Sequence, residues 1–262
     1  MHSEGQASAQ GVKEKCWAAC LGDCSNRMSR EHLVSESLFP NQRIGVSGFD
    51  WCKGEDRYIS ISGLTSKILC EHHNNTLSPA DEEGARAYQT ATEMVRLAYE
   101  RGKQKAHRWN IKRMQIDGPK LERWFLKTLI NLSYDRGHPI GRDSGISGRP
   151  SDRLVRIAYG LETFSGLAGL HMVAAVGTDH HFRDEVAFAN VVRDGVHAEA
   201  GCFFFHGMIV LLCLEAQGPP HPLTGLTLHG VDLGTAHIKF HLEHVNWDVK
   251  GYRSHSIDFR WS

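Results

Sequence analysis

The chain has 262 residues, of which 41% are hydrophobic and 23% are charged, a composition typical of folded globular proteins and not of disordered ones. Thirty basic residues balance thirty acidic ones, which excludes a uniformly basic nucleic-acid-binding surface and leaves only local patches for that role. There is no apolar run of about 18 residues and no secretory signal at the N-terminus, so we expect no membrane span and a cytoplasmic location.

The first half of the chain is predicted to begin with short segments and to continue with two helices. Residues 32–39 and 58–64 are rich in apolar side chains between turn signals, which predicts strands. A helix is predicted over residues 78–104, because acidic residues occupy its first turn and apolar residues recur at helical spacing. A second helix is predicted over residues 118–134, on the same periodicity. The apolar positions of the first helix are Ala87, Ala91, Met94, Leu97 and Ala98.

The second half is predicted to be mostly antiparallel β-structure. Residues 135–153 hold many glycine, proline, serine and aspartate residues, which indicates a loop or linker. Strand-like patterns follow at residues 154–159, 170–176, 202–215, 226–233, 237–245 and 256–261. The predicted fold class is therefore α+β, with one domain over residues 1–117 and a second, made of a helix and antiparallel β-structure, over residues 118–262.

The cysteines are concentrated near the N-terminus. Five of the seven lie within the first seventy residues, which in a reducing compartment indicates metal binding before disulfide formation. Structural zinc takes four sulfur or nitrogen ligands. Two can come from the N-terminal segment with cysteines at every fourth position, a zinc knuckle, and two from a C-x-x-H motif at the start of a helix. The favoured ligands are Cys16, Cys24, Cys70 and His73. Cys20 is the alternative for a knuckle position, and Cys52 is a further candidate.

A second pattern is interleaved with these cysteines. The stretch SREHLVSESLF contains the acid–histidine pair Glu31-His32, and in LCEHHNNTLSPAD the residue Asn74 directly follows His73. Together these motifs resemble the HNH, or ββα-metal, endonuclease family, and most of all a zinc-stapled branch of it. The resemblance covers residues 16–85, a third of the chain. It implies an N-terminal ββα-metal domain in which the zinc ion is structural.

The resemblance also implies roles for individual residues. The strand histidine of the family is the general base that deprotonates the attacking water, a role that falls here to His32. The acid beside it and the residue at the helix start hold a divalent cation, and these are Glu31 and Asn74. Their oxygen ligands suit Mg²⁺ or Mn²⁺. The expected function is therefore a metal-dependent HNH-type endonuclease that hydrolyses phosphodiester bonds in DNA, with RNA as the other candidate substrate.

One position departs from the family pattern. The family's central asparagine, which fixes the loop that bears the base, is missing from the stretch SGLTSKILC, where Thr65 or Ser66 stands in its place. A hydroxyl group can make a comparable backbone hydrogen bond. The alternative is a catalytically inactive zinc-binding module that keeps the HNH fold and recognises nucleic acid or protein.

A basic segment follows the first predicted helix. Residues 101–128 contain nine basic and two acidic side chains with two tryptophans among them, a pattern that favours binding to phosphates. The residues that we assign to this patch are Lys103, Lys105, Arg108, Lys112 and Arg113. The C-terminal β-rich domain is expected to choose the substrate or to join protomers into a homo-oligomer.

Overall fold

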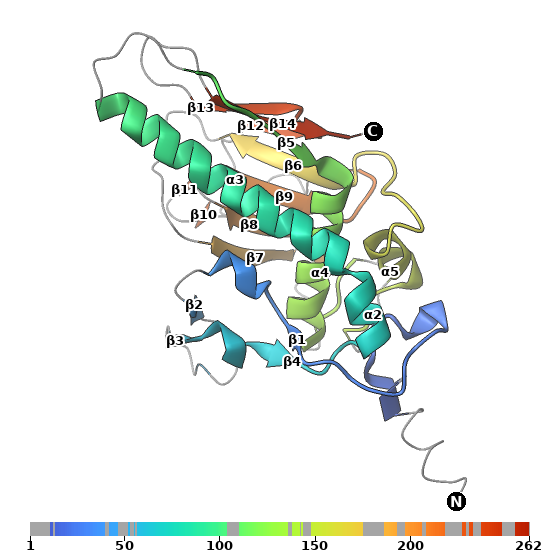
Figure 1. The fold of residues 1–262 in the computed structure, drawn as a ribbon. Coiled ribbons are helices and arrows are strands. Elements are labelled where there is room, and N and C mark those ends of the chain that lie inside the picture. The colour runs from blue at the N-terminus through green and yellow to red at the C-terminus, as the bar shows by residue number, and fades with distance from the viewer. Residues whose placement is uncertain are drawn as a thin grey trace, which may run out of the picture. The chain divides into compact units, whose positions relative to one another are not determined.

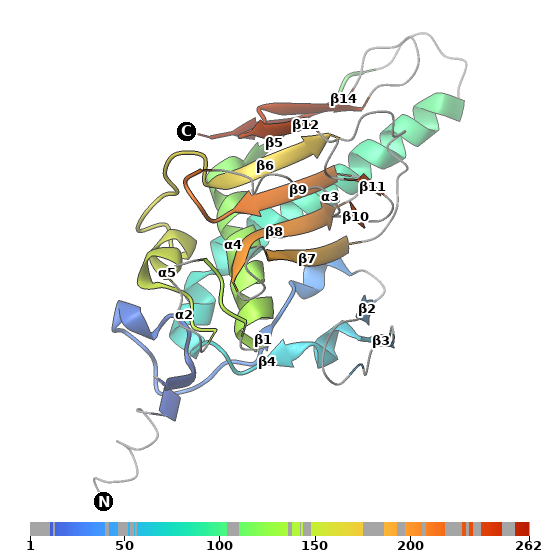
Figure 2. The same cartoon turned by 180° about the vertical axis from the view of Figure 1, so that it is seen from behind.

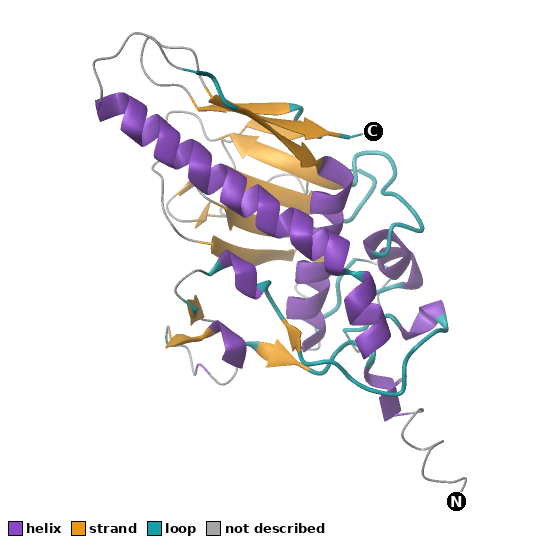
Figure 3. Cartoon of the chain, in the orientation of Figure 1, coloured by secondary structure: helices purple, strands orange, loops and turns teal. Residues whose placement is uncertain are grey.

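The structure is a computed structural model of the chain, and it describes residues 11–12, 14–39, 42–46, 52, 55, 57–103, 110–135, 138–141, 143, 148–174, 186–192, 197–205, 208–217, 227–228, 231–232, 237–247 and 255–261. Within them, helices combine with mostly antiparallel sheets, which confirms the predicted α+β class (Figure 3). The chain forms two compact units. The first comprises Met1–Glu82, Arg123–Thr163 and Val192–Ala198, and the second comprises Glu83–Glu122, Phe164–Val191 and Glu199–Ser262. The expected division after residue 117 stays a prediction.

The first unit is built from short elements. Its strands are β1 (Glu31–His32), β2 (Arg43–Val46), β3 (Arg57–Ser60) and β4 (Thr65–Ser66), and its short helices are α2 (Glu71–Thr76) and α5 (Asp152–Ala158). Strand β1 pairs with β4 and β2 pairs with β3, both antiparallel. Figure 1 shows β1 beside β4, from which the chain leads into α2. Single 3-10 turns occupy Ala19–Leu21, Glu36–Leu38 and Ile61–Gly63.

Most of the long strands belong to the second unit. A five-stranded sheet has the order β12-β6-β9-β8-β7, and a three-stranded sheet has the order β13-β14-β5. From residue 83 onward, helix α3 (Ser78–Lys103) crosses one face of the five-stranded sheet, as both views show (Figures 1 and 2). The strand bounds are β5 Arg113–Asp117, β6 Gly169–Ala174, β7 Val186–Val192, β8 Ala198–Phe205, β9 Met208–Cys213, β10 Thr227–Leu228, β11 Val231–Asp232, β12 His237–Phe240, β13 His244–Trp247 and β14 His255–Arg260.

The two long predicted helices are confirmed. Helix α3 ends one residue before its predicted end, and helix α4 (Gly118–Asp135) ends one residue after it. Four of the five predicted apolar positions of α3 are buried, and Leu97 is half-buried. Helical periodicity over such lengths is strong enough to predict both the element and its buried face.

Several strand predictions are wrong. Residues 154–159 lie mostly in helix α5, because Ser151 caps it with a 3.3 Å hydrogen bond from the Leu154 N–H to its hydroxyl. The predicted strand 32–39 stops at His32 and turns into a 3-10 helix. The segment predicted over 202–215 is a hairpin of two antiparallel strands, β8 and β9. Strand β5 was not predicted, since its partner β14 lies far away in sequence and pairs with it in parallel.

Among the described residues, no helix has both the length and the apolar character needed to cross a lipid bilayer.

Candidate metal centre

The structure brings together the four favoured zinc ligands of the first unit, Cys16, Cys24, Cys70 and His73. Their ligand atoms all lie within 4.8 Å of one another. The sulfur atoms of Cys16 and Cys70 are each 3.3 Å from Nδ1 of His73, and that of Cys24 is 3.6 Å from it. A tetrahedral zinc ion with its usual bond lengths separates a nitrogen from a sulfur ligand by about 3.5 Å. The donor set and its spacing therefore fit zinc.

Helix α2 positions two of the ligands. Cys70 is its N-cap residue, and the Cys70 sulfur accepts a hydrogen bond from the His73 N–H at 3.5 Å. The C-x-x-H spacing thus places both side chains on the first turn of the helix. A hydrogen bond of 3.5 Å from the Cys70 N–H to the Cys16 sulfur joins the knuckle to the helix start.

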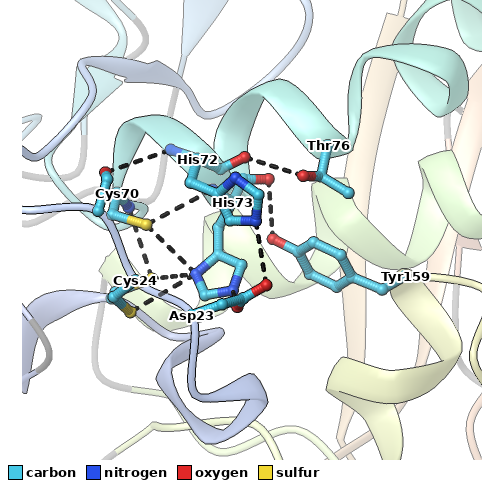
Figure 4. Close-up of polar contacts among 9 residues, drawn as sticks. Asp23, Cys24, Cys70, His72, His73, Thr76 and Tyr159 are labelled. Carbon is cyan, nitrogen blue, oxygen red and sulfur yellow. Dashed lines mark hydrogen bonds and ion pairs between the residues drawn. The ribbon is translucent and has the colours of Figure 1, made fainter.

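Asp23 is a further residue of the centre, and sequence reasoning missed it. Its carboxylate lies 2.7 Å from Nε2 of His73, on the side of the ring away from the sulfurs (Figure 4). A carboxylate in this place keeps the hydrogen on Nε2 and leaves Nδ1 as the ligand atom. Tyr159 adds a second support, because its hydroxyl donates to the His73 carbonyl oxygen at 2.9 Å. No spacing rule points to either residue, since both act through His73.

The electrostatics of the thiols also favour a cation. Burial raises the pKa of Cys16 and of Cys24, and the charge of Cys70 raises the pKa of both further. Burial acts in the same direction on Cys70, but hydrogen bonds from His73 and Ser25 outweigh it and lower the pKa of that thiol. Three thiolates this close together need a positive charge to balance them, and a divalent ion supplies it.

The alternative ligands lie outside this cluster. Cys20 is an exposed residue whose sulfur is partly desolvated, and this desolvation together with the nearby Asp152 carboxylate raises its pKa to about 11. Cys52 is buried elsewhere and is not among the grouped residues. Of the three knuckle cysteines, Cys16 and Cys24 therefore belong to the centre and Cys20 does not.

The residues predicted to hold a catalytic divalent cation have other partners. Glu31 is buried, and its carboxylate lies 2.7 Å from the ammonium group of Lys127. The side-chain N–H of Asn74 donates to the Ser29 hydroxyl at 2.9 Å. An ammonium group on the Glu31 carboxylate does not fit a divalent Mg²⁺ or Mn²⁺ ion bonded to the same oxygen.

His32, the predicted general base, lies directly opposite Thr65 in the β1–β4 pair. Its side chain is 30% exposed, and Nε2 is 3.6 Å from the carboxylate of Glu36. Glu31 and His32 are consecutive strand residues, so their side chains point to opposite faces: Glu31 into the core and His32 toward solvent.

The predicted basic patch is described only in part. Lys103 places its ammonium 3.9 Å from the centre of the Tyr99 ring, and Lys112 forms an ion pair of 2.9 Å with Glu93. Arg113 is exposed at the start of β5. Lys105 and Arg108 lie outside the described residues.

Comparisons of the chain with protein-family models, with curated proteins and with solved structures found no match.

Proposed function

We propose that this chain is an HNH-type endonuclease whose N-terminal ββα unit is held together by a structural zinc ion. The zinc ligands are Cys16, Cys24, Cys70 and His73. His32 is the general base that takes a proton from the water attacking a phosphodiester bond in DNA. The four protein ligands leave zinc no open position, so the ion supports the fold and takes no part in the chemistry.

The observation that carries the proposal is the short antiparallel β1–β4 ladder, which holds His32, together with an isolated bridge that connects the same two segments at the metal centre. At one end, Met28 pairs with Cys70, and the Ser29 N–H donates to the Leu69 carbonyl at 2.9 Å. At the other end, His32 pairs with Thr65. In the chain, the β2–β3 pair lies between β1 and β4, and helix α2 follows β4, with zinc ligands where that segment meets the helix. This is the arrangement that the resemblance to the HNH family implies.

The face of the β1–β4 ladder that bears His32 carries side chains that can bind the phosphate group of a phosphodiester. Residues paired across a ladder share a face, so the Thr65 hydroxyl lies beside the imidazole. Arg30 is exposed and donates from Nη2 to that hydroxyl at 3.3 Å. A guanidinium group binds phosphate oxygens well, and it neutralises charge close to the base. This placement supports phosphodiester hydrolysis on the outer face of the ladder.

A second candidate function has an observation of its own in its favour. The hydroxyl of Thr65, one of the two candidates for the place of the family's central asparagine, accepts from Arg30, and the Glu31 carboxylate contacts Lys127 instead of a divalent ion. Both features favour a zinc-stabilised module that recognises nucleic acid or protein without cutting it. The two candidates differ in whether cleavage occurs and whether it depends on His32.

A nicking assay on supercoiled plasmid separates them. We expect the wild-type chain to nick DNA, and His32→Ala to slow nicking by at least about 100-fold while zinc content and circular dichroism stay unchanged. His138→Ala is the matched control, because His138 is an exposed histidine of the same unit. It should leave the rate unchanged.

Parallel assays with added Mg²⁺, with Mn²⁺ and with neither test the cation requirement, and a labelled RNA tests the other substrate. Absence of cleavage under every condition by a zinc-loaded wild-type protein would favour the recognition module. Full activity of His32→Ala would remove this residue from the mechanism.

A further inference from the structure

Lys127 is a buried cation that the predicted chemistry leaves unexplained. It lies on helix α4 and is 4% exposed. Its ammonium group is 2.7 Å from Glu31 Oε1 and 2.5 Å from Asp81 Oδ2. Lysine is almost never this buried unless its charge is paired, and here two carboxylates of the same unit pair with it.

The surrounding side chains fix both carboxylates in place. The second oxygen of Asp81 accepts from the Ser35 hydroxyl at 3.0 Å, which itself accepts from the indole N–H of Trp124 at 2.9 Å. On the other side, the Asn131 amide donates to Glu31 Oε1 at 3.3 Å and also lies 3.4 Å from the His32 carbonyl oxygen. The charged groups thus sit in a hydrogen-bonded network that also holds the backbone of His32.

The ammonium group of Lys127 lies where a metal cation bound to the Glu31 carboxylate would lie. The resemblance assigns this carboxylate to a divalent ion, yet its Oε1 already contacts an ammonium group on one side and an amide donor on the other. A divalent ion bonded to the same oxygen would lie within a few ångströms of the ammonium charge, in a buried environment that screens little.

We infer that the ammonium group of Lys127 takes the place of the divalent cation on Glu31, so that the protein supplies this charge itself and binds no Mg²⁺ or Mn²⁺ there. Lys127 is then a positioning residue, which holds Glu31 and, through it and Asn131, the strand of His32. The role that this inference gives to Glu31, which is to hold the strand of the general base, rests on the proposed function. The contact between Glu31 and Lys127 does not depend on that function.

The charge state of the Lys127 side chain is consistent with this role. Burial acts to lower the pKa of Lys127, but Asp81 and Glu31 outweigh it and raise the pKa, so the side chain stays an ammonium ion at neutral pH. With two carboxylates around one ammonium group, removal of the ammonium would leave two acidic side chains and an amide facing one another. Such a set of oxygen ligands attracts a hard divalent cation.

Binding of Mn²⁺ to the zinc-loaded full chain, followed by electron paramagnetic resonance, tests the inference without reference to cleavage. The single substitution Glu31→Gln should leave Mn²⁺ binding the same as in the wild-type protein. Lys127→Met removes the charge at similar length and should increase Mn²⁺ affinity at least tenfold, and adding Glu31→Gln should abolish this gain. Lys120→Met, on the same helix but half-buried beside Asp117, is the matched control and should gain nothing.

Two results would overturn the inference: Mn²⁺ binding by the wild-type chain that Glu31→Gln weakens, or a folded Lys127→Met variant with no gain in affinity. If Lys127→Met does not fold, the wild-type and Glu31→Gln comparison decides alone. A chain that never cleaves but shows the expected Mn²⁺ pattern would refute the proposed nuclease and leave the inference standing.

Discussion

At the scale of single residues, the metal centre depends on contacts behind its ligands. His73 presents Nδ1 to the three sulfurs because Asp23 holds Nε2 and Tyr159 holds its carbonyl oxygen. His73 is 1% exposed, so this orientation is protected from solvent. An imidazole whose Nε2 is held by a carboxylate, on a backbone that is also held, loses little further freedom when a metal binds.

Two cysteine substitutions test the ligand set. Cys70→Ala should reduce zinc from about one ion per chain to none and should unfold the first unit, since binding free energy of a structural zinc ion is folding free energy. Cys20→Ala is the matched control and should keep its zinc, because Cys20 lies outside the cluster. Elemental analysis with near-ultraviolet circular dichroism measures both effects. A folded, metal-loaded Cys70→Ala protein would contradict the assignment.

At the scale of elements, the start of helix α4 is shaped by the C-terminal strand. A Cβ atom added at Gly118 would lie 2.5 Å from the Trp261 ring and 2.8 Å from the Arg260 carbonyl oxygen. The tryptophan ring cannot easily move away. Its Nε1 donates to the Leu242 carbonyl at 3.0 Å, and its face stacks on His241 with 4.0 Å between ring centres. Glycine at this position is therefore required by close packing.

Gly118→Ala should destabilise the second unit by about 1–3 kcal/mol, because the added Cβ atom overpacks against the Trp261 ring and the Arg260 carbonyl oxygen. Gly63→Ala serves as the control, since nothing lies within 4 Å of the added Cβ atom there. Its expected effect is within about 0.5 kcal/mol of zero. Denaturant unfolding monitored by circular dichroism gives both values. Equal stabilities for the two variants would mean that the Trp261 contact does not constrain the helix.

At the scale of the whole molecule, both units have an apolar core, and they differ in the polar groups that are buried with it. The first also holds the Cys/His cluster and the Lys127 network. The second contains the extended sheets, and its strand β9 is buried along Ile209–Cys213. Two of its buried polar residues are histidines, His171 and His255, and burial lowers the pKa of each. Acid is therefore expected to weaken this unit.

The direction of this pH dependence follows from the number of protons that the folded and the unfolded chain bind. With the pKa of His171 lower in the folded than in the unfolded chain, the unfolded chain binds more protons, so the free energy of unfolding falls as pH drops below about 7. His171→Phe should make this dependence shallower, by up to one proton in the slope between about pH 7 and pH 5. Chemical unfolding across that range, with near-ultraviolet circular dichroism as the readout, measures the slope. A slope identical to that of the wild-type chain would show that His171 does not contribute.

Local sequence patterns were sufficient to predict part of the structure of this protein. The periodicity of apolar residues predicted α3 and α4 to within a residue, and the cysteine spacing predicted the four grouped ligands. Both signals are local: a helix hydrogen-bonds within itself, and C-x-x-H places two ligands on one helical turn. The helical cap at Ser151 is local too, but the apolar run after it fits a strand equally well, and the strand prediction was wrong.

The sequence by itself therefore determined the fold class, the long helices and the four residues of the Cys/His cluster. Only the tertiary structure decided which carboxylate supports His73 and that β5 pairs with β14. It also decided that Glu31 contacts a buried ammonium group and an amide from a residue one hundred positions along the chain. The physical reason is that charge pairing and strand pairing act through space, between groups whose separation in sequence leaves no periodic or spacing signal.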